Sequence, residues 1–82
     1  MTSPELRRTI DALWRMESPR LIASLTRMLR DVGLAEDMAQ EALVAAQERW
    51  PREGVPDNPA AWLMTTARRR ATDRLRQRQL HH

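Results

Sequence analysis

The sequence predicts an all-α protein made of three helices. Along three stretches of the chain, apolar residues recur every three or four positions, which is the spacing of one face of a helix. No stretch shows the apolar–polar alternation that a half-buried strand needs. Segments containing proline or glycine separate the stretches, and 82 residues are enough for one small domain.

The first helix is expected to begin at Ser3 and Pro4, because serine is a favoured N-cap and proline is favoured at the first helical position. Its apolar stripe contains Leu6, Ile10, Leu13, Trp14, Leu21, Ile22, Leu25, Met28, Leu29 and Val32. Ser18 and Pro19 interrupt this stripe. Either a second helix begins there, or one long helix bends because proline cannot donate a backbone hydrogen bond.

The second helix is expected to follow Gly33, which is typical of a left-handed residue that ends a helix. Glu36 and Asp37 suit its first turn, because acids favour helix N-termini. Its apolar stripe contains Met38, Ala39, Ala42, Leu43, Ala46 and Trp50. Pro51 is predicted to end the helix, and residues 51–58 are predicted to form an irregular loop.

The third helix is predicted from Pro59 to about Gln79, since Asn58 before Pro59 repeats the pattern of an N-cap followed by proline. Its apolar residues are Trp62, Leu63, Ala67, Ala71 and Leu75.

Positive charge is concentrated in this last helix. All fourteen basic residues are arginine, and six of them lie between Arg68 and Arg78 beside one acid, Asp73. The preceding residues carry eight arginines and ten acids. Such a basic end indicates either contact with phosphates or a solvated helix terminus, where cations favour the negative end of the helix dipole.

The composition argues against enzymes and metal proteins. The chain has no cysteine, and its two histidines are the adjacent His81 and His82, so neither a catalytic triad nor a thiolate metal site can form. It has no glycine-rich phosphate loop either. We therefore expect no catalysis, no metal and no cofactor. Without a signal peptide or a long apolar run, we expect a cytoplasmic protein with no membrane contact.

Two stretches of the chain carry recognisable motifs. Residues 35–50 contain Asp37, Gln40 and Glu41 in the pattern Asp-x-x-Gln-Glu. Residues 61–76 contain Trp-Leu, then Ala-Arg, then Asp-x-x-Arg. In this order the two stretches resemble region 2 of the extracytoplasmic-function (ECF) sigma factors of bacteria, in which the second stretch is the promoter-reading helix. The resemblance covers residues 8–78.

The resemblance implies a region 2 domain over residues 1–80, with its first helix unbroken but bent near Ser18 and Pro19. The second DNA-binding domain of the family, region 4, is absent, so the chain is expected to be a fragment. Residues 81–82 are typical of the beginning of an affinity tag.

The resemblance also implies two binding surfaces for transcription initiation. Residues expected to contact the β′ clamp coiled coil of core RNA polymerase are Asp37, Gln40, Glu41, Leu43 and Gln47. Residues expected to recognise and melt the promoter −10 element, by capturing bases of its nontemplate strand, are Glu53, Val55, Pro56, Asp57, Asn58, Trp62, Thr66, Arg69, Arg70, Asp73 and Arg74. An anti-sigma regulator is a further candidate partner.

Two of these positions leave alternatives open. Relatives often carry asparagine where this chain has Arg69, so their base preference does not transfer, although a guanidinium can bind guanine or phosphate. Trp62 either stacks on a base or supports the core. The chain has three tryptophans and no phenylalanine or tyrosine, so the core has only tryptophans as large aromatic side chains. Two other functions remain as alternatives: a helical regulator that binds duplex DNA, and a protein-interaction module.

Overall fold

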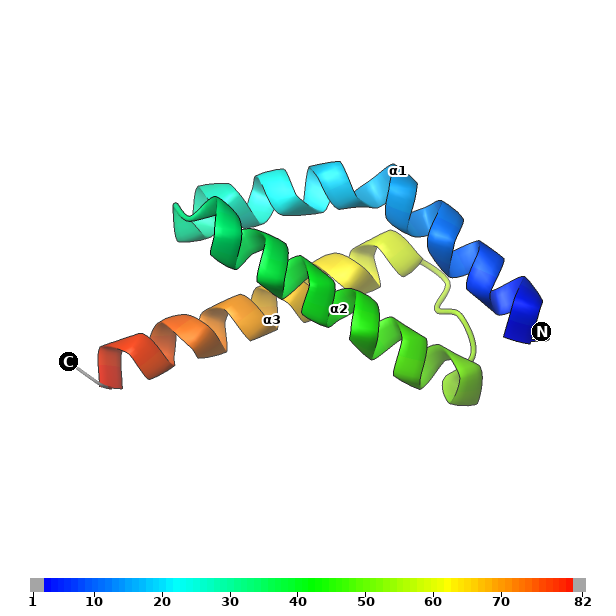
Figure 1. The fold of residues 1–82 in the computed structure, drawn as a ribbon. Helices are drawn as coiled ribbons and strands as arrows, with labels where there is room; N and C mark the ends of the chain where they lie inside the picture. Colours follow the sequence, from blue (N-terminus) through cyan, green and yellow to red (C-terminus); the bar gives the residue numbers. More distant parts are fainter. Residues whose placement is uncertain (1–2, 81–82) are drawn as a thin grey trace.

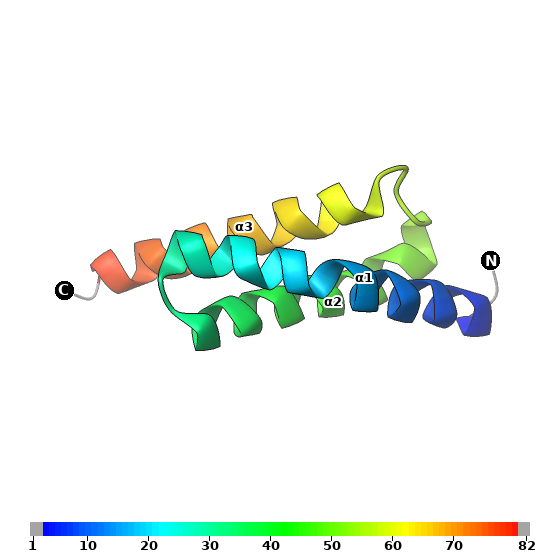
Figure 2. The same ribbon diagram turned by 90° about the horizontal axis from the view of Figure 1, so that it is seen from above.

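The computed structural model describes residues 3–80, which form three helices that run in alternating directions (Figure 1). They are α1 (Ser3–Leu29), α2 (Val32–Glu53) and α3 (Pro59–Leu80). Each helix contacts the other two, and α1 lies across the α2–α3 pair when the molecule is seen from above (Figure 2). The molecule is elongated, with extents of 46 × 23 × 18 Å. The prediction of an all-α, three-helix fold is confirmed.

The first helix is one bent helix and not two. Pro19 lies inside α1, which continues without a break to Leu29. The ribbon bends near the middle of α1 (Figure 1). A proline supplies no N–H to the carbonyl four residues earlier, and its ring crowds that carbonyl, so the helix bends there. The bend keeps both halves in the core, since Leu6 and Ile10 before it and Leu21 and Leu25 after it are buried.

The turn between α1 and α2 differs from the prediction. Arg30, and not Gly33, is the left-handed residue, with φ 55° and an N–H donated to the Thr26 carbonyl at 2.7 Å. Asp31 caps α2 by accepting the N–H of Leu34 at 3.0 Å, which places Gly33 in the first helical turn. This cap starts α2 earlier than predicted.

Because α2 starts at Val32, its first turn contains no acid. Glu36 and Asp37 therefore lie one turn inside the helix, and the prediction that they open it is wrong. Their acidic side chains are free of a capping role, and both residues are exposed.

The second helix also ends later than predicted. Pro51 lies inside α2, which extends to Glu53. Proline has a helical φ, so it can occupy the last turn at the cost of one hydrogen bond. Gly54 then ends the helix at φ 87° and donates its N–H to the Trp50 carbonyl at 2.8 Å. The loop to α3 is thus residues 54–58, shorter than the predicted loop.

Asn58 caps α3 as the sequence predicts. Its side-chain oxygen accepts the N–H of Ala61 at 3.1 Å, and Pro59 is the first helical residue. The predicted end near Gln79 agrees with the observed end at Leu80. The expected affinity tag at residues 81–82 lies outside the described residues.

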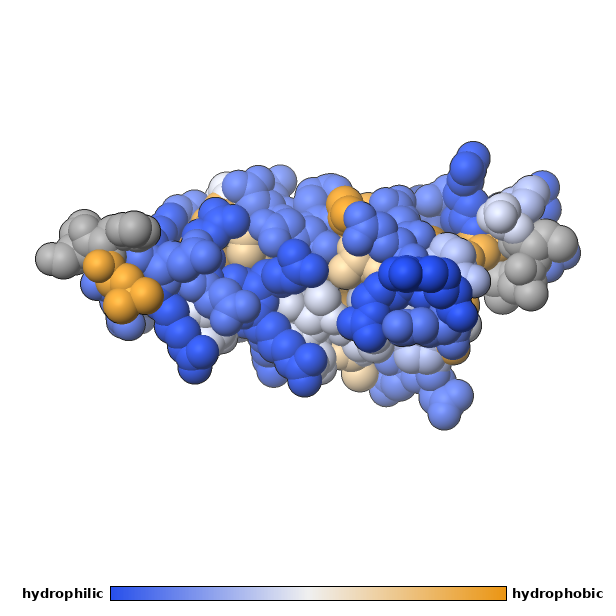
Figure 3. Space-filling model, turned by 90° about the horizontal axis from the view of Figure 1, so that it is seen from below, coloured by the Kyte–Doolittle hydropathy of each residue, from blue (hydrophilic) through white to orange (hydrophobic). Residues whose placement is uncertain are grey.

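The core is built from leucines packed against alanines. Fully buried alanines lie on α2 and α3, at Ala35, Ala39, Ala42, Ala46, Ala67 and Ala71. Small side chains let helix axes approach closely, and large residues such as Leu25 and Met38 fill the remaining space. The face seen from below is mainly hydrophilic (Figure 3). The close α2–α3 contact fixes the relative position of the two helices that carry the candidate binding residues.

Candidate functional site

The outward face of α2 carries most of the predicted polymerase contacts. Asp37, Gln40 and Gln47 are exposed on it. Leu43 is half-buried and packs against the core, so only part of it reaches the surface. Sequence reasoning missed Val44, which is 47% exposed. It follows Gln40 by four positions, so the helical period would have placed it on this face.

Glu41 differs from its neighbours, because it binds α3. Arg70 Nη1 donates to its Oε1 at 3.2 Å, and Arg74 Nη2 donates to its Oε2 at 3.3 Å. Both carboxylate oxygens are thus occupied within the domain. We call Glu41, Arg70 and Arg74 the Glu41 cluster. It unites a predicted polymerase contact with two predicted DNA contacts in one link between α2 and α3.

The solvent side of α3 forms a shallow, polar groove. The residues that line this α3 groove are Thr65, Arg68, Arg69, Thr72, Asp73 and Arg76. Its volume is about 490 Å³. It brings together the predicted DNA contacts Arg69 and Asp73. The predicted residue Thr66 does not line the groove and is half-buried.

Four residues of the α3 groove were missing from the predicted contacts: Thr65, Arg68, Thr72 and Arg76. The helical period is the signal for Thr65, Thr72 and Arg76, since each lies three or four positions from Arg69 or Asp73. Arg68 lies three positions after Thr65 and four before Thr72, so the same period places it beside them. Arg68 also reaches α1, where its Nη2 donates to Ser24 Oγ at 3.4 Å. Guanidinium and hydroxyl groups bind phosphates, and a carboxylate accepts hydrogen bonds from base amino groups. The groove therefore has the chemistry of a nucleic-acid surface.

The loop residues have several structural roles. Val55 is half-buried and packs against the core, and Pro56 is half-buried as well. Asp57 is exposed, while Asn58 uses its side-chain oxygen as the cap of α3. Glu53 is the last residue of α2, and not part of the loop. Gly54, Asp57 and Asn58 are thus the exposed residues of this loop.

Trp62, at the beginning of α3, packs mainly within the protein. Its ring meets that of buried Trp50 edge to face, with centroids 5.3 Å apart. The guanidinium carbon Cζ of Arg49 lies 5.7 Å from the Trp62 ring centroid. Arg49 in turn pairs with Glu53, at 3.3 Å between Nη2 and Oε2. The alternative in which Trp62 supports the core agrees with these contacts.

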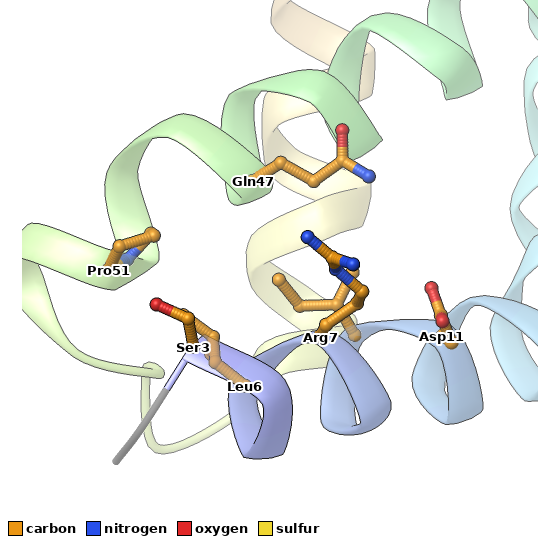
Figure 4. Close-up of a pocket in the computed structure, with 7 residues that line it drawn as sticks. Ser3, Leu6, Arg7, Asp11, Gln47 and Pro51 are labelled. Carbon is orange, nitrogen blue, oxygen red and sulfur yellow. The ribbon is translucent and has the colours of Figure 1, made fainter.

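Two hollows lie between the beginning of α1 and the end of α2. In the first, of about 290 Å³, Arg7 and Asp11 of α1 face Gln47 of α2, with Pro51 nearby (Figure 4). The second, of about 310 Å³, lies beside Trp50, Gly54 and Val55, at the base of the loop. The two hollows share Leu6 and Pro51.

Other kinds of site find no support in the described part of the chain. Among residues 3–80, no group of three or more His, Cys, Asp or Glu side chains could hold a metal ion. None of the helices in this range has the length and apolar character needed to cross a membrane.

Comparisons with known proteins identify the family of this chain. The family model for sigma-70 region 2 matches residues 13–81. An ECF RNA polymerase sigma factor SigK of Mycobacterium sp. (strain KMS) is 38% identical over 69 residues, which are 79% of this chain and 34% of that protein. SigK of Mycobacterium ulcerans (strain Agy99) is 38% identical over 64 residues, 73% of this chain and 33% of that protein.

A further relative carries no functional name. An uncharacterized protein of Rhizobium meliloti (strain 1021) is 41% identical over 58 residues, 71% of this chain and 14% of that protein. The chain thus aligns with about a third or less of the length of these relatives. No solved structure matches. The family match spans most of the chain, and the chain therefore belongs to the sigma-70 region 2 family, as a sigma factor domain of the ECF type.

Proposed function

We propose that this domain docks on core RNA polymerase through α2 and holds the unpaired nontemplate strand of the −10 element with α3 and the loop 54–58. The observation that carries the proposal is the arginine-lined α3 groove, which begins at Thr65, about two helical turns after that loop. A sigma factor domain in transcription initiation has to contact both the enzyme and the promoter. The candidate residues for these two contacts lie on different helices.

The α3 groove suits a single DNA strand. Arg68, Arg69 and Arg76 offer positive charge for the phosphates, and the threonine hydroxyls offer further hydrogen bonds. Asp73 can accept a hydrogen bond from a base amino group, which adds selectivity. A loop before the helix suits base capture, because its exposed backbone groups can bond the edge of a base that has left the stack.

The outward face of α2 suits a basic partner. Asp37 supplies an exposed negative charge, Gln40 and Gln47 supply amides, and Val44 supplies a small apolar contact. The family partner for this helix is the β′ clamp coiled coil. Complementary charges on such a surface accelerate encounter and set orientation more than they add affinity.

A pull-down of core RNA polymerase tests the docking surface. Asp37→Arg is the informative variant, because Asp37 is exposed and takes part in no ion pair within residues 3–80. Glu41→Arg is unsuitable, since it would place a third arginine against Arg70 and Arg74. We expect Asp37→Arg to lose polymerase and the matched loop variant Asp57→Arg to retain it. Equal retention by both variants would contradict docking through α2.

Binding of the polymerase complex to labelled DNA tests the strand surface. We expect single-stranded DNA to bind more tightly than duplex, and Arg69→Gln with Arg76→Gln to weaken it. The matched pair Arg70→Gln with Arg74→Gln removes the same charge from the Glu41 cluster and is expected to weaken binding less. A preference for duplex DNA in the absence of polymerase would favour the alternative of a duplex-binding regulator.

A further inference from the structure

Two side chains in a cation–π contact, Arg49 and Trp62, lie at the base of the loop 54–58. Arg49 belongs to the end of α2, and Trp62 belongs to the beginning of α3. The guanidinium lies over the indole ring, with 5.7 Å between Cζ and the ring centroid. This separation is within the range of a cation–π contact. The pair therefore joins the two helix ends that the loop connects.

Both members of the pair are held in place by further contacts. Trp62 packs edge to face on buried Trp50, at an interplanar angle of 67°. Arg49 is paired with Glu53, one turn later on the same helix. The Arg49 side chain nevertheless keeps 52% of its surface exposed. The result is a guanidinium that contacts the indole on one side and solvent on the other.

This arrangement determines what an incoming base would meet. Trp62 is half-buried, and Arg49 covers part of its ring. A base that approaches from the side of Arg49 meets the guanidinium before it meets the indole. A guanidinium is planar and stacks on nucleobases, whereas a lysine ammonium is a compact charge that does not stack in this way.

We infer that Arg49 is a strand-contacting residue of this domain, and that its guanidinium, supported by Trp62, stacks on an unpaired base beside the loop. The inference rests on the proposed function, because it needs an unpaired strand at the loop. It adds a position on α2 to a strand surface otherwise formed by α3 and the loop. Trp62 is then a positioning residue that acts through Arg49.

The test measures affinity for single-stranded DNA in the complex with core RNA polymerase. The probe is a labelled pool of short single strands of random sequence, read by fluorescence anisotropy. The variants are Arg49→Gln, Arg49→Lys and the control Arg52→Gln. Arg52 is exposed, lies on the same helix end and forms no ion pair in the described chain.

We expect Arg49→Gln to weaken binding about ten-fold, which is the scale of one lost stacking contact. Arg49→Lys is expected to show most of this loss although it keeps the charge. Arg52→Gln is expected to change affinity less than about two-fold, as one exposed charge with no specific contact. Full affinity in Arg49→Lys would overturn the stacking role, and so would equal effects of Arg49→Gln and Arg52→Gln.

A second comparison tests the support from Trp62. Trp62→Leu is expected to weaken binding in the wild-type background and to have no further effect in Arg49→Gln, with helix content verified by circular dichroism. An equal effect in both backgrounds would show that Trp62 acts without Arg49. If wild type binds polymerase and single strands but Arg49 variants behave as the control, this inference alone fails. If wild type binds neither polymerase nor single strands, the proposed function fails together with this inference.

Discussion

Replacing Glu41 by glutamine tests how the two functional helices are held together. The substitution keeps the size of the side chain and removes the charge that Arg70 and Arg74 share. Their guanidinium nitrogens lie 3.2 and 3.3 Å from the carboxylate oxygens. We expect Glu41→Gln to lower the free energy of unfolding by an amount that depends on salt.

The exposure of the Glu41 cluster sets the size of the expected loss in the free energy of unfolding. The side chains are 36% exposed for Glu41, 47% for Arg70 and 41% for Arg74, so water screens both pairs. An exposed ion pair contributes about 0.2–1 kcal/mol, and two pairs that share one carboxylate give about 0.5–1.5 kcal/mol at low salt. At about 1 M salt the Debye length falls to about 3 Å, which is similar to these separations. Most of the difference in the free energy of unfolding between wild type and Glu41→Gln should then disappear.

The assay is urea unfolding at about 0.05 M and about 1 M salt, followed by circular dichroism. A double-mutant cycle compares Glu41→Gln, the pair Arg70→Gln with Arg74→Gln, and the triple variant. We expect a coupling energy that shrinks at high salt. A coupling energy that stays constant with salt, or a loss greater than about 3 kcal/mol, would refute the description of the Glu41 cluster as a solvent-screened link.

Three further substitutions test the packing and the caps. Asp31→Ala removes the side-chain cap of α2 and should cost about 1 kcal/mol in thermal or urea unfolding, whereas Asp31→Asn should keep most of it. Arg30→Gly relieves the positive φ of 55° and should stabilise by about 0.5–1 kcal/mol; a loss of stability would show that the Arg30 side chain matters more than its backbone. Ala67→Leu overfills a fully buried position and should cost about 1–3 kcal/mol, while Ala61→Leu on the exposed side of α3 should be tolerated.

The features that the sequence predicted correctly depend on neighbouring residues. The apolar stripes place three helices because helical period and burial act together over many positions. Asn58 could be identified as a cap because the cap bonds an N–H only three residues away. The left-handed residue could not be identified in this way. Asp31 accepts the N–H of Leu34 and so places the turn at Arg30, although Gly33 has the better intrinsic propensity for a left-handed conformation.

The contacts between helices could not be predicted from the sequence, for a different reason. Glu41 lies 29 and 33 positions before its two arginines, and no periodic pattern relates them. Their meeting depends on how closely α2 and α3 approach, which buried alanines on both helices permit. Arg49 and Trp62 likewise meet only because the loop 54–58 turns the chain back. The helix on which each of these residues lies was thus predictable, but their pairing was not.

Ion pairs divide the arginines of α3 into those bound to a carboxylate and those that line the α3 groove. A salt titration of single-strand binding can distinguish the two groups. Of the six arginines between 68 and 78, Arg70 and Arg74 bind Glu41, and Arg78 lies 3.9 Å from Asp31. The other three line the α3 groove and, in the proposed function, neutralise phosphates. Single-strand affinity should therefore fall with a slope of about −2 in log K against log salt, and not the slope of about −4 that six phosphate contacts would give. A slope near −4 would mean that strand binding releases Arg70 and Arg74 from Glu41 and Arg78 from Asp31 as well. The Glu41 carboxylate would then be free for a basic partner on α2.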